Sequence, residues 1–475
     1  MNTLKKLLVV GAVVLIGTGI YFLYGQHQTV LVQVTDSGFV PQKTFVQKGD
    51  TVKFVNETNR AIWPASDSHP THGLYSEFDP KKPLPAGASW SFTFGRAGVW
   101  VYHDHEAPQM RGSVTVIGAS GETRESCLAT SASTSIACYE GDMLDTLENK
   151  GLEAALDLLK EWYTDDAAFQ PKCHDVTHIL GVAAYKKYTT NHEITKRPEV
   201  SYCGYGFYHG FVEEMLFNAG AGQYEEIRSY CATFRSGQKL DNLAASCYHG
   251  TGHAMFDSLD GRDRGDDLSM TKRALALCQE AFSDNEERLQ CASGVFNALD
   301  VAYNNRSYGL SFSKIDPMHV CAAQQKEYQP NCYLFVAIGT LHNLSLNQEQ
   351  ALRFIKTIPD RQSELKVLFG YMGDSVQRSI ATIDLSVFRS LCESFSGEEL
   401  EACVRGVTTG LREAGTPGKE YERLFAFCRL LEDKTVHVLC HQITVNAARS
   451  LAADKEDFVR ACLLEENESL RARCK

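Results

Sequence analysis

The sequence predicts a multidomain protein with three parts: an N-terminal transmembrane helix, an all-β sandwich and an all-α region stapled by disulfide bonds. Three observations predict this order. An unbroken apolar run begins at Leu7, segments of alternating apolar and polar residues follow up to Gly118, and all 16 cysteines of the 475-residue chain lie beyond Gly118. A chain of this length exceeds what one hydrophobic core usually holds, so several domains are expected.

The first segment has the pattern of a membrane anchor. Lys5 and Lys6 precede 18 uncharged and mostly apolar residues, 7–24, which as a helix would span about 27 Å. A cleaved signal peptide is the alternative, but no small-residue cleavage site follows and aromatic residues end the run. We therefore predict an uncleaved signal-anchor over residues 1–26. The protein is then single-pass, with the bulk of the chain extracytoplasmic, in a periplasm or at the cell surface.

Three segments predict the β domain. Residues 46–56 contain a Lys-Gly-Asp turn followed by an alternating strand, residues 87–94 fit the next hairpin, and Ser-Val-Thr-Val at 113–116 alternates as a final strand. Just before that strand, residues 101–112 read Val-Tyr-His-Asp-His-Glu-Ala-Pro-Gln-Met-Arg-Gly. Together these segments resemble the plastocyanin-like cupredoxin family over about residues 29–118. The resemblance implies a Greek-key sandwich, placed at 27–118, that binds copper.

The chain departs from the family at the copper ligands. In the family, a late loop supplies a cysteine, a histidine and a methionine, and an earlier loop supplies a second histidine. The resemblance places Met110 in register, but it puts Asp104 at the cysteine, Ala107 at the late histidine and Trp63 near the earlier one. A blue copper site requires the cysteine thiolate. We therefore predict that no blue site is present.

Four other histidines gather in the same two loops. His103 and His105 lie two apart on a predicted strand, so their side chains point to the same face of the sheet. His69 and His72 lie in the earlier loop, and either can complete a site with Met110 beside it. Imidazole nitrogens favour Cu(II) among the common metals, so copper is the predicted cofactor. The alternative is a degenerate cupredoxin whose histidines are polar rim residues.

Cysteine spacing predicts the architecture of residues 138–475, which follow a linker at 119–137. Seven pairs of consecutive cysteines lie 11 to 16 positions apart, and several of these intervals contain a helix start such as Ser283 or Ser396, each with Glu three residues later. Antiparallel helical hairpins place such cysteines within disulfide reach. The predicted disulfides are Cys231–Cys247, Cys278–Cys291, Cys321–Cys332, Cys392–Cys403, Cys428–Cys440 and Cys462–Cys474, with Cys127–Cys138 and Cys173–Cys203 as weaker pairs.

The second cysteines of these pairs recur about every 34 to 44 residues, with one cysteine-free repeat around 358–376. This period predicts an α-solenoid of helix pairs. The architecture resembles the cysteine-rich Sel1-like and tetratricopeptide arrays, although their consensus residues do not appear. An irregular disulfide-bonded α-domain is the alternative.

A second group of histidines lies early in the helical region. They are His174, His178, His209, His249 and His253. The pairs 174/178 and 249/253 have i, i+4 spacing, which puts both side chains on one helix face and suits a shared metal such as zinc, iron or copper. The alternative is buried histidines satisfied by carbonyls or carboxylates. The nearby glycines are expected to allow close helix packing or tight turns; they are Gly204, Gly206, Gly210, Gly250 and Gly252.

The composition of the chain reduces the number of functions to consider. The net charge of −12 disfavours binding to a phosphate backbone, so we predict no nucleic-acid partner. The leading hypothesis is a membrane-anchored copper protein for metal handling or electron transfer at a non-blue histidine site, with the membrane and a redox or protein partner as its contacts. One alternative is a metalloenzyme, such as an oxidoreductase, centred on the helical cluster. Another is a protein-binding scaffold on the helical repeats.

Overall fold

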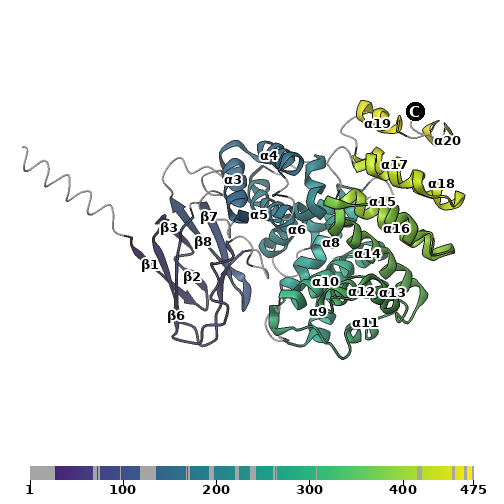
Figure 1. Cartoon of the computed structure of the whole chain (residues 1–475). Coiled ribbons are helices and arrows are strands. Elements are labelled where there is room, and N and C mark those ends of the chain that lie inside the picture. Colours follow the sequence, from purple (N-terminus) through teal and green to yellow (C-terminus); the bar gives the residue numbers. More distant parts are fainter. Residues whose placement is uncertain are drawn as a thin grey trace, which may run out of the picture. The chain divides into compact units, whose positions relative to one another are not determined.

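A computed structural model describes most of the chain. The described residues are 27–67, 72, 75–96, 98–117, 135–166, 168–169, 172–191, 197–219, 224–235, 242–259, 263, 265–305, 307–414, 420–451, 455–464 and 468–472. They form two compact units, one built of strands and one built of helices (Figure 1). Residues 118–134, which include most of the predicted linker, lie outside this description.

The β unit is a sandwich of two four-stranded sheets. The first sheet has the order β2-β1-β4-β6 and the second β3-β8-β7-β5. The pairs β1/β4 and β3/β8 are parallel, and the other pairs are antiparallel. The strands are β1 (Thr29–Thr35), β2 (Gly38–Val40), β3 (Lys43–Gln47), β4 (Thr51–Asn56), β5 (Pro64–Ser66), β6 (Ser89–Thr93), β7 (Gly98–Asp104) and β8 (Ala107–Ile117).

Alternation along the strands builds the core of the sandwich. In β4 the side chains of Val52 and Phe54 are fully buried, whereas Lys53 between them is exposed, as expected where only one face of a strand is covered. Tyr102 on β7 packs against Phe54, with ring centroids 5.2 Å apart. This core fixes the ends of β5 and β7, where the histidines lie.

The second unit is entirely helical among the described residues. Its α-helices are α3 (Ser135–Lys150), α4 (Leu152–Asp165), α5 (Cys173–Asn191), α6 (Tyr202–Ala219), α7 (Glu225–Ala232), α8 (Asn242–Asp257), α9 (Asp267–Ala281), α10 (Asn285–Asn305), α11 (His319–Ala322), α12 (Gln329–Asn343), α13 (Gln348–Ile355), α14 (Arg361–Ser379), α15 (Leu385–Cys392), α16 (Gly397–Glu413), α17 (Glu420–Leu430), α18 (Lys434–Leu451), α19 (Lys455–Cys462) and α20 (Glu468–Arg471). From α7 onward, a shorter helix usually precedes a longer one, and the longer helices pack side by side in chain order.

Disulfides join the two helices of successive pairs. They are Cys231–Cys247, Cys278–Cys291, Cys321–Cys332, Cys392–Cys403 and Cys428–Cys440, and Cys173–Cys203 joins α5 to α6. The Cα atoms of bridged residues lie 5.3 to 5.8 Å apart, within the usual range. Cys138 and Cys462 are also disulfide-bonded, but Cys127 and Cys474 lie outside the described residues. The pair α13/α14 is the cysteine-free repeat.

Helix starts follow the predicted caps with one shift. α10 begins one residue later than expected, because the Asp284 carboxylate, not Ser283, accepts from the backbone amides of Glu286 and Glu287. An aspartate is an equally good N-cap. At α16 the cap residue is Ser396 as expected, but its side chain makes no capping hydrogen bond.

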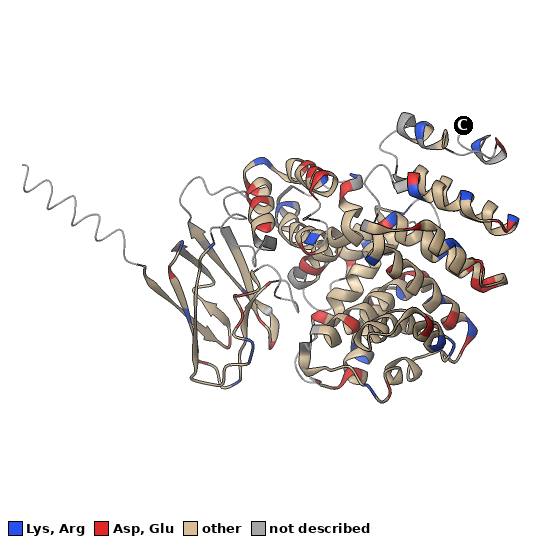
Figure 2. Cartoon of the chain, in the orientation of Figure 1, with Lys and Arg blue, Asp and Glu red and all other residues tan. Residues whose placement is uncertain are grey.

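Acidic and basic residues are interspersed along the helices (Figure 2). One group links successive helix pairs: Glu399 on α16 accepts from Lys356, which follows α13, at 2.6 Å and from Arg361 on α14 at 2.7 Å. All three side chains are partly exposed, so each ion pair contributes about 0–1 kcal/mol. The pairs therefore orient neighbouring repeats more than they stabilise them.

The predicted fold class is wrong in its first element. Among the helices of the described residues, none is long and apolar enough to cross a membrane. A span needs about 20 consecutive apolar residues, whereas the longest helix, α10, carries Glu286, Glu287, Arg288 and Asp300. Residues 1–26, on which the predicted anchor falls, lie outside the described residues.

Candidate metal centres

Three histidine imidazoles converge on one point. The ligand nitrogens of His72, His103 and His105 all lie within 4.8 Å of one another, and all three residues are buried. His103 lies on β7 and His105 directly follows it, whereas His72 comes from the connection between β5 and β6. The backbone of His72 has a φ of +55°, a left-handed conformation that non-glycine residues rarely adopt. The chain therefore turns sharply at this residue.

Two contacts orient the pair from β7. His103 Nδ1 lies 2.7 Å from Asp67 Oδ1, and Asp67 Oδ2 lies 3.3 Å from Arg111 Nη1. The ring of His105 lies against Trp63, with centroids 4.6 Å apart, and the His105 amide donates to the Trp63 carbonyl. A carboxylate on one ring nitrogen of a histidine fixes its tautomer and makes the other nitrogen a better ligand. His103 therefore presents Nε2 as its ligand atom.

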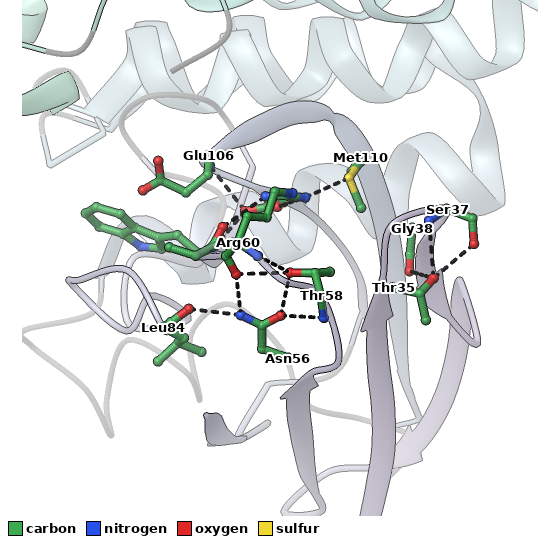
Figure 3. A network of polar contacts seen from close by, with 12 residues as sticks. Thr35, Ser37, Gly38, Asn56, Thr58, Arg60, Leu84, Glu106 and Met110 are labelled. Carbon is green, nitrogen blue, oxygen red and sulfur yellow. Dashed lines mark hydrogen bonds and ion pairs between the residues drawn. The ribbon is translucent and has the colours of Figure 1, made fainter. Parts of the chain in front are cut away.

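Asp104, at the position of the family's cysteine, has a structural role. Its Oδ1 accepts from the amides of Trp63 and Glu106 at 2.7 and 3.2 Å, and its Oδ2 forms a 2.7 Å ion pair with Arg60. Arg60 also donates to Met110 Sδ at 3.0 Å, as Figure 3 shows. The carboxylate is fully buried. Asp104 thus ties the start of β5 to the β7–β8 hairpin.

A second network of hydrogen bonds holds the backbone around Arg60 in place. Asn56 donates to the carbonyls of Arg60 and Leu84 at 2.8 and 3.1 Å, and Thr58 donates to both the Asn56 amide oxygen and the Arg60 carbonyl (Figure 3). These bonds satisfy buried polar groups near the end of β4. They fix the backbone from which Arg60 reaches Asp104.

The sandwich does not fit a blue copper centre. A blue centre needs a thiolate, but all cysteines lie beyond Gly118 in the sequence, and the cysteine position holds a carboxylate engaged with Arg60. A non-blue copper ion fits the three imidazoles, because neutral imidazole nitrogen is a good copper ligand. His72, His103 and His105 would hold such an ion, which would supply a redox-active cation at the end of the sandwich.

The helical unit contains a second convergence of three imidazoles. The ligand nitrogens of His209 on α6 and of His249 and His253 on α8 all lie within 4.8 Å of one another. His249 Nε2 and His253 Nε2 are 3.2 Å apart. The ring centroids of His209 and His253 are 4.8 Å apart. Residues about 40 positions apart thus meet at one point between two helices.

Glycines let these helices approach closely. A Cβ added at Gly294 on α10 would lie 1.9 Å from the His249 carbonyl oxygen, and one at Gly252 on α8 would lie 1.9 Å from that of Cys291. A Cβ at Gly250 would meet the Cα and ring of His209 at 3.2 Å. At Gly210 on α6, the same atom would lie 1.9 Å from the carbonyl oxygen of His178. The expectation of close packing is therefore confirmed for Gly210, Gly250 and Gly252.

Neighbouring groups orient the helical histidines. His249 Nδ1 lies 3.2 Å from Ser293 Oγ, and Asn297 Nδ2 lies 3.3 Å from His249 Nε2. At one edge, the exposed His174 donates through Nδ1 to the carbonyl of Cys203 at 2.8 Å, and its ring centroid lies 5.3 Å from that of His209. His178 Nε2 lies 3.1 Å from Glu213 Oε2 instead of joining the triad.

The triad is held in its neutral form. Burial, followed by the charge of His253, holds the pKa of His209 well below its usual range, and burial with the charge of His249 does the same for His253. Burial, with a smaller effect of His174, lowers the pKa of His249 to about 4. Desolvation disfavours the charged imidazolium. All three rings are therefore neutral at neutral pH, which is the state that binds metal.

The structure brings together some of the predicted ligands and separates others. His72, His103 and His105 converge, whereas His69 lies outside the described residues and Met110 contacts Arg60. Of the five helical candidates, His209, His249 and His253 converge, His178 pairs with Glu213, and His174 lies at the edge. The pair His437 and His441 on α18 has rings 4.5 Å apart; among the described residues no third imidazole joins it in a metal-sized cluster.

Sequence reasoning missed the residues that orient the ligands. Asp67 lies two residues before His69 in the same histidine-rich loop, and an acidic residue there was a usable signal. Ser293 and Asn297 gave no such signal, because they lie more than 40 positions from His249. Only the packing of α10 against α8 brings them together.

The solved structures that match the chain include cupredoxins. A purple cupredoxin from Nitrosopumilus maritimus matches with 18% identity and a TM-score of 0.16, over 18% of this chain and 99% of its own. A reduced Cu(I) form of an amicyanin mutant matches with 23% identity and a TM-score of 0.17, over 19% and 82%. A mutant plastocyanin of a fern matches with 20% identity and a TM-score of 0.16, over 18% and 100%. No protein-family model matches the chain, and no curated protein matches it.

Proposed function

We propose that this protein binds copper through His72, His103 and His105 and serves to hold or transfer the ion, not to carry electrons as a blue copper protein does. The observation that carries the proposal is the convergence of three buried imidazoles, whose ligand nitrogens lie within 4.8 Å of one another. Three neutral nitrogen ligands without a thiolate favour Cu(II) over the other common divalent ions.

The polar surroundings support a metal ligand set. His103 is completely buried, and the carboxylate of Asp67 lies against its Nδ1. A carboxylate behind a ligating histidine is the usual arrangement at metal sites. The Asp67 carboxylate also offsets part of the positive charge that an ion would bring into a buried position. Arg111 on the other side of Asp67 fixes the carboxylate in this orientation.

The absence of a thiolate in the ligand set separates the proposed role from blue electron transfer. The blue site owes its properties to a short copper–thiolate bond in a trigonal set. Here Asp104 occupies that position in a buried ion pair with Arg60. Copper held by imidazoles alone changes its preferred geometry between Cu(II) and Cu(I), which suits uptake and release better than rapid electron exchange.

We also propose that the protein works in an oxidising compartment outside the cytoplasm. The six described disulfides join helices throughout the second unit. Structural disulfides persist in such compartments and are rare in a reducing cytosol.

Metal analysis of the full chain tests the copper proposal. The purified chain, stripped with a chelator, is titrated with Cu(II) and followed by elemental analysis and electron-paramagnetic resonance. We expect a nitrogen-ligated Cu(II) signal whose hyperfine pattern reports several imidazoles. His103→Gln and His105→Gln should each weaken binding at this site at least about 100-fold, because each removes a direct ligand and loss of even an outer partner costs about 10–100-fold.

The matched control is His27→Gln, which changes a histidine of the sandwich whose side chain is 67% exposed. This variant should retain the same signal and stoichiometry. An intense thiolate-to-copper charge-transfer band in the visible spectrum would overturn the proposal, because it would require a cysteine ligand. Unchanged Cu(II) binding in the His103→Gln/His105→Gln double variant, with no change in the spectrum, would overturn it equally.

A further inference from the structure

The helical unit contains a histidine cluster that the proposed copper site does not use. We propose that His209, His249 and His253 form a second, independent site for a divalent transition metal ion of the zinc and copper class, with three protein ligands and an open fourth position. The site draws on α6 and α8 and is braced by α10. It involves no residue of the sandwich.

Distances between the ligand nitrogens support the assignment. His249 Nε2 and His253 Nε2 are 3.2 Å apart. A tetrahedral ion with metal–nitrogen bonds of about 2.0–2.1 Å holds its ligand nitrogens about 3.3–3.4 Å apart. The third nitrogen, from His209, lies within 4.8 Å of both. An ion therefore needs only small rotations of side chains to bind all three.

The helix spacing supplies the pair from α8. His249 and His253 are four residues apart, so they lie on the same face of the helix, one turn from each other. The i, i+4 pair recurs on α18 as His437 and His441. The difference at α8 is the third imidazole, which His209 delivers. Gly250 leaves room for it, because a Cβ added at Gly250 would lie 3.2 Å from the Cα and the ring of His209.

The partners of His249 and His174 are those of a metal site. Ser293 Oγ lies 3.2 Å from His249 Nδ1, which leaves Nε2 to face the other two rings. His174 donates its Nδ1 proton to the carbonyl of Cys203 and so keeps Nε2 as an acceptor beside His209. Such outer contacts fix the tautomer of a ligating histidine. The fourth position is then open to water, to an exogenous ligand or to His174.

Hydrogen bonding between neutral imidazoles is the competing explanation for the cluster. The 3.2 Å contact between His249 and His253 satisfies one ring nitrogen of each. A hydrogen bond of that kind needs only two rings, however, whereas His209 brings a third imidazole within 4.8 Å of both. Placing a third desolvated imidazole beside the pair adds a cost of burial that a bound cation would offset.

A titration in a background without the sandwich site tests the inference. The full chain carrying His103→Gln and His105→Gln is stripped with a chelator and titrated with Zn²⁺, and then with Co²⁺ as a spectroscopic probe. We expect one equivalent of Zn²⁺ and Co²⁺ ligand-field bands of four- or five-coordinate geometry. Adding His249→Gln or His253→Gln should weaken binding at least about 100-fold, as expected when a direct ligand is removed.

The matched control in the same background is His437→Gln/His441→Gln, which removes a pair of equal spacing from α18. Retention of the equivalent in this control and its loss in the α8 variants supports the site. X-ray absorption of the Zn²⁺-loaded chain, with the α8 histidines unaltered, gives a second measurement if an α8 variant fails to fold; it should show about three imidazoles. No stoichiometric binding of Zn²⁺ or Co²⁺ in the background chain, or equal loss in the control, would overturn the inference. Neither result bears on the copper proposal.

Discussion

Both histidine triads bring three imidazoles together, but they differ in how far apart the ligands lie in the sequence. In the sandwich, His103 and His105 are neighbours in sequence and the carboxylate of Asp67 orients one of them. In the helical unit, His209 lies 40 or more positions from its partners, and a hydroxyl and an amide contact His249. The first site takes His103 and His105 from the end of one strand. The helical site depends on the distance between the helices that carry its ligands.

This difference has a consequence for robustness. A strand end keeps two ligands together as long as the hairpin forms, so its site depends on local charges. A site between helices requires the two helix backbones to lie close together over several turns. It therefore depends on glycines at the helix contact. Substitutions that change either the local charges or the close helix contact test this difference between the two sites. The largest expected effect comes first.

Gly294→Ala should have the largest effect. The new Cβ would meet the His249 carbonyl oxygen at 1.9 Å, so α10 must move away from α8 at a cost of about 3 kcal/mol, the upper end for overpacked positions. The move also draws Ser293 away from His249. Chemical denaturation followed by far-ultraviolet circular dichroism, which helices dominate, measures the loss of stability.

Gly141→Ala on α3 is the matched control for Gly294→Ala. Its added Cβ meets nothing within 4 Å, so the same substitution should stabilise the helix by about 0.5–1 kcal/mol. Equal and small effects at both positions would show that the contact between α8 and α10 tolerates extra volume. In that case helix approach would not limit the helical site.

Asp104→Asn should have the next largest effect, and it acts on the sandwich. The change breaks a buried ion pair, which usually costs about 3–5 kcal/mol. We expect about 2–3 kcal/mol here, because the Arg60 side chain is 37% exposed and retains contact with water. Thermal unfolding followed by tryptophan fluorescence reports this, since Trp63, Trp90 and Trp100 all lie in the sandwich. No loss of stability would contradict the structural role of Asp104.

Asp67→Asn should weaken copper binding at the sandwich about 10–100-fold, the usual cost of losing the partner of a ligating histidine. An amide preserves the shape and a hydrogen bond to His103, but it removes the charge that raises the basicity of the imidazole. Competition with a chelator of known affinity measures the change. Zn²⁺ binding in the helical unit should stay the same in this variant, and a parallel loss there would contradict the independence of the two sites.

Ser293→Ala should have the smallest effect. The hydroxyl is a neutral partner of His249 at 3.2 Å, so its loss removes an orienting contact worth about 1 kcal/mol, or roughly fivefold in Zn²⁺ affinity. Isothermal titration of the chain lacking the sandwich site measures it. A loss as large as that caused by His249→Gln would show that Ser293 does more than orient the ring.

Much of the candidate chemistry was predictable from sequence, because short-range rules govern it. The same-face placement of His103 and His105 follows from the period of a strand, and the shared face of His249 and His253 follows from the period of a helix. The spacing of Cys278 and Cys291 follows from the length of a helical hairpin. The choice among candidates did not follow: nothing local to His178 indicates that it pairs with Glu213 at 3.1 Å.

The membrane-anchor prediction illustrates the limit of composition. An apolar run predicts a membrane-spanning helix by its length alone. No helix of the described residues is long and apolar enough to span a membrane. The role of Asp104 illustrates the same limit in the sandwich. Its position suggested only a missing ligand, whereas the structure shows a buried carboxylate that joins Arg60 to the backbone of Trp63.

Local patterns in the sequence predicted the alternating strands and the helix starts. They also predicted which cysteines can form a disulfide and which histidines lie on the same face of a strand or helix. These properties depend on residues within one or two turns of each other. The tertiary structure decided which histidines meet, because His72 reaches β7 and His209 reaches α8 only through packing between segments far apart in the chain. Close approach of backbones at Gly250, Gly252 and Gly294 sets the distances on which a metal site depends.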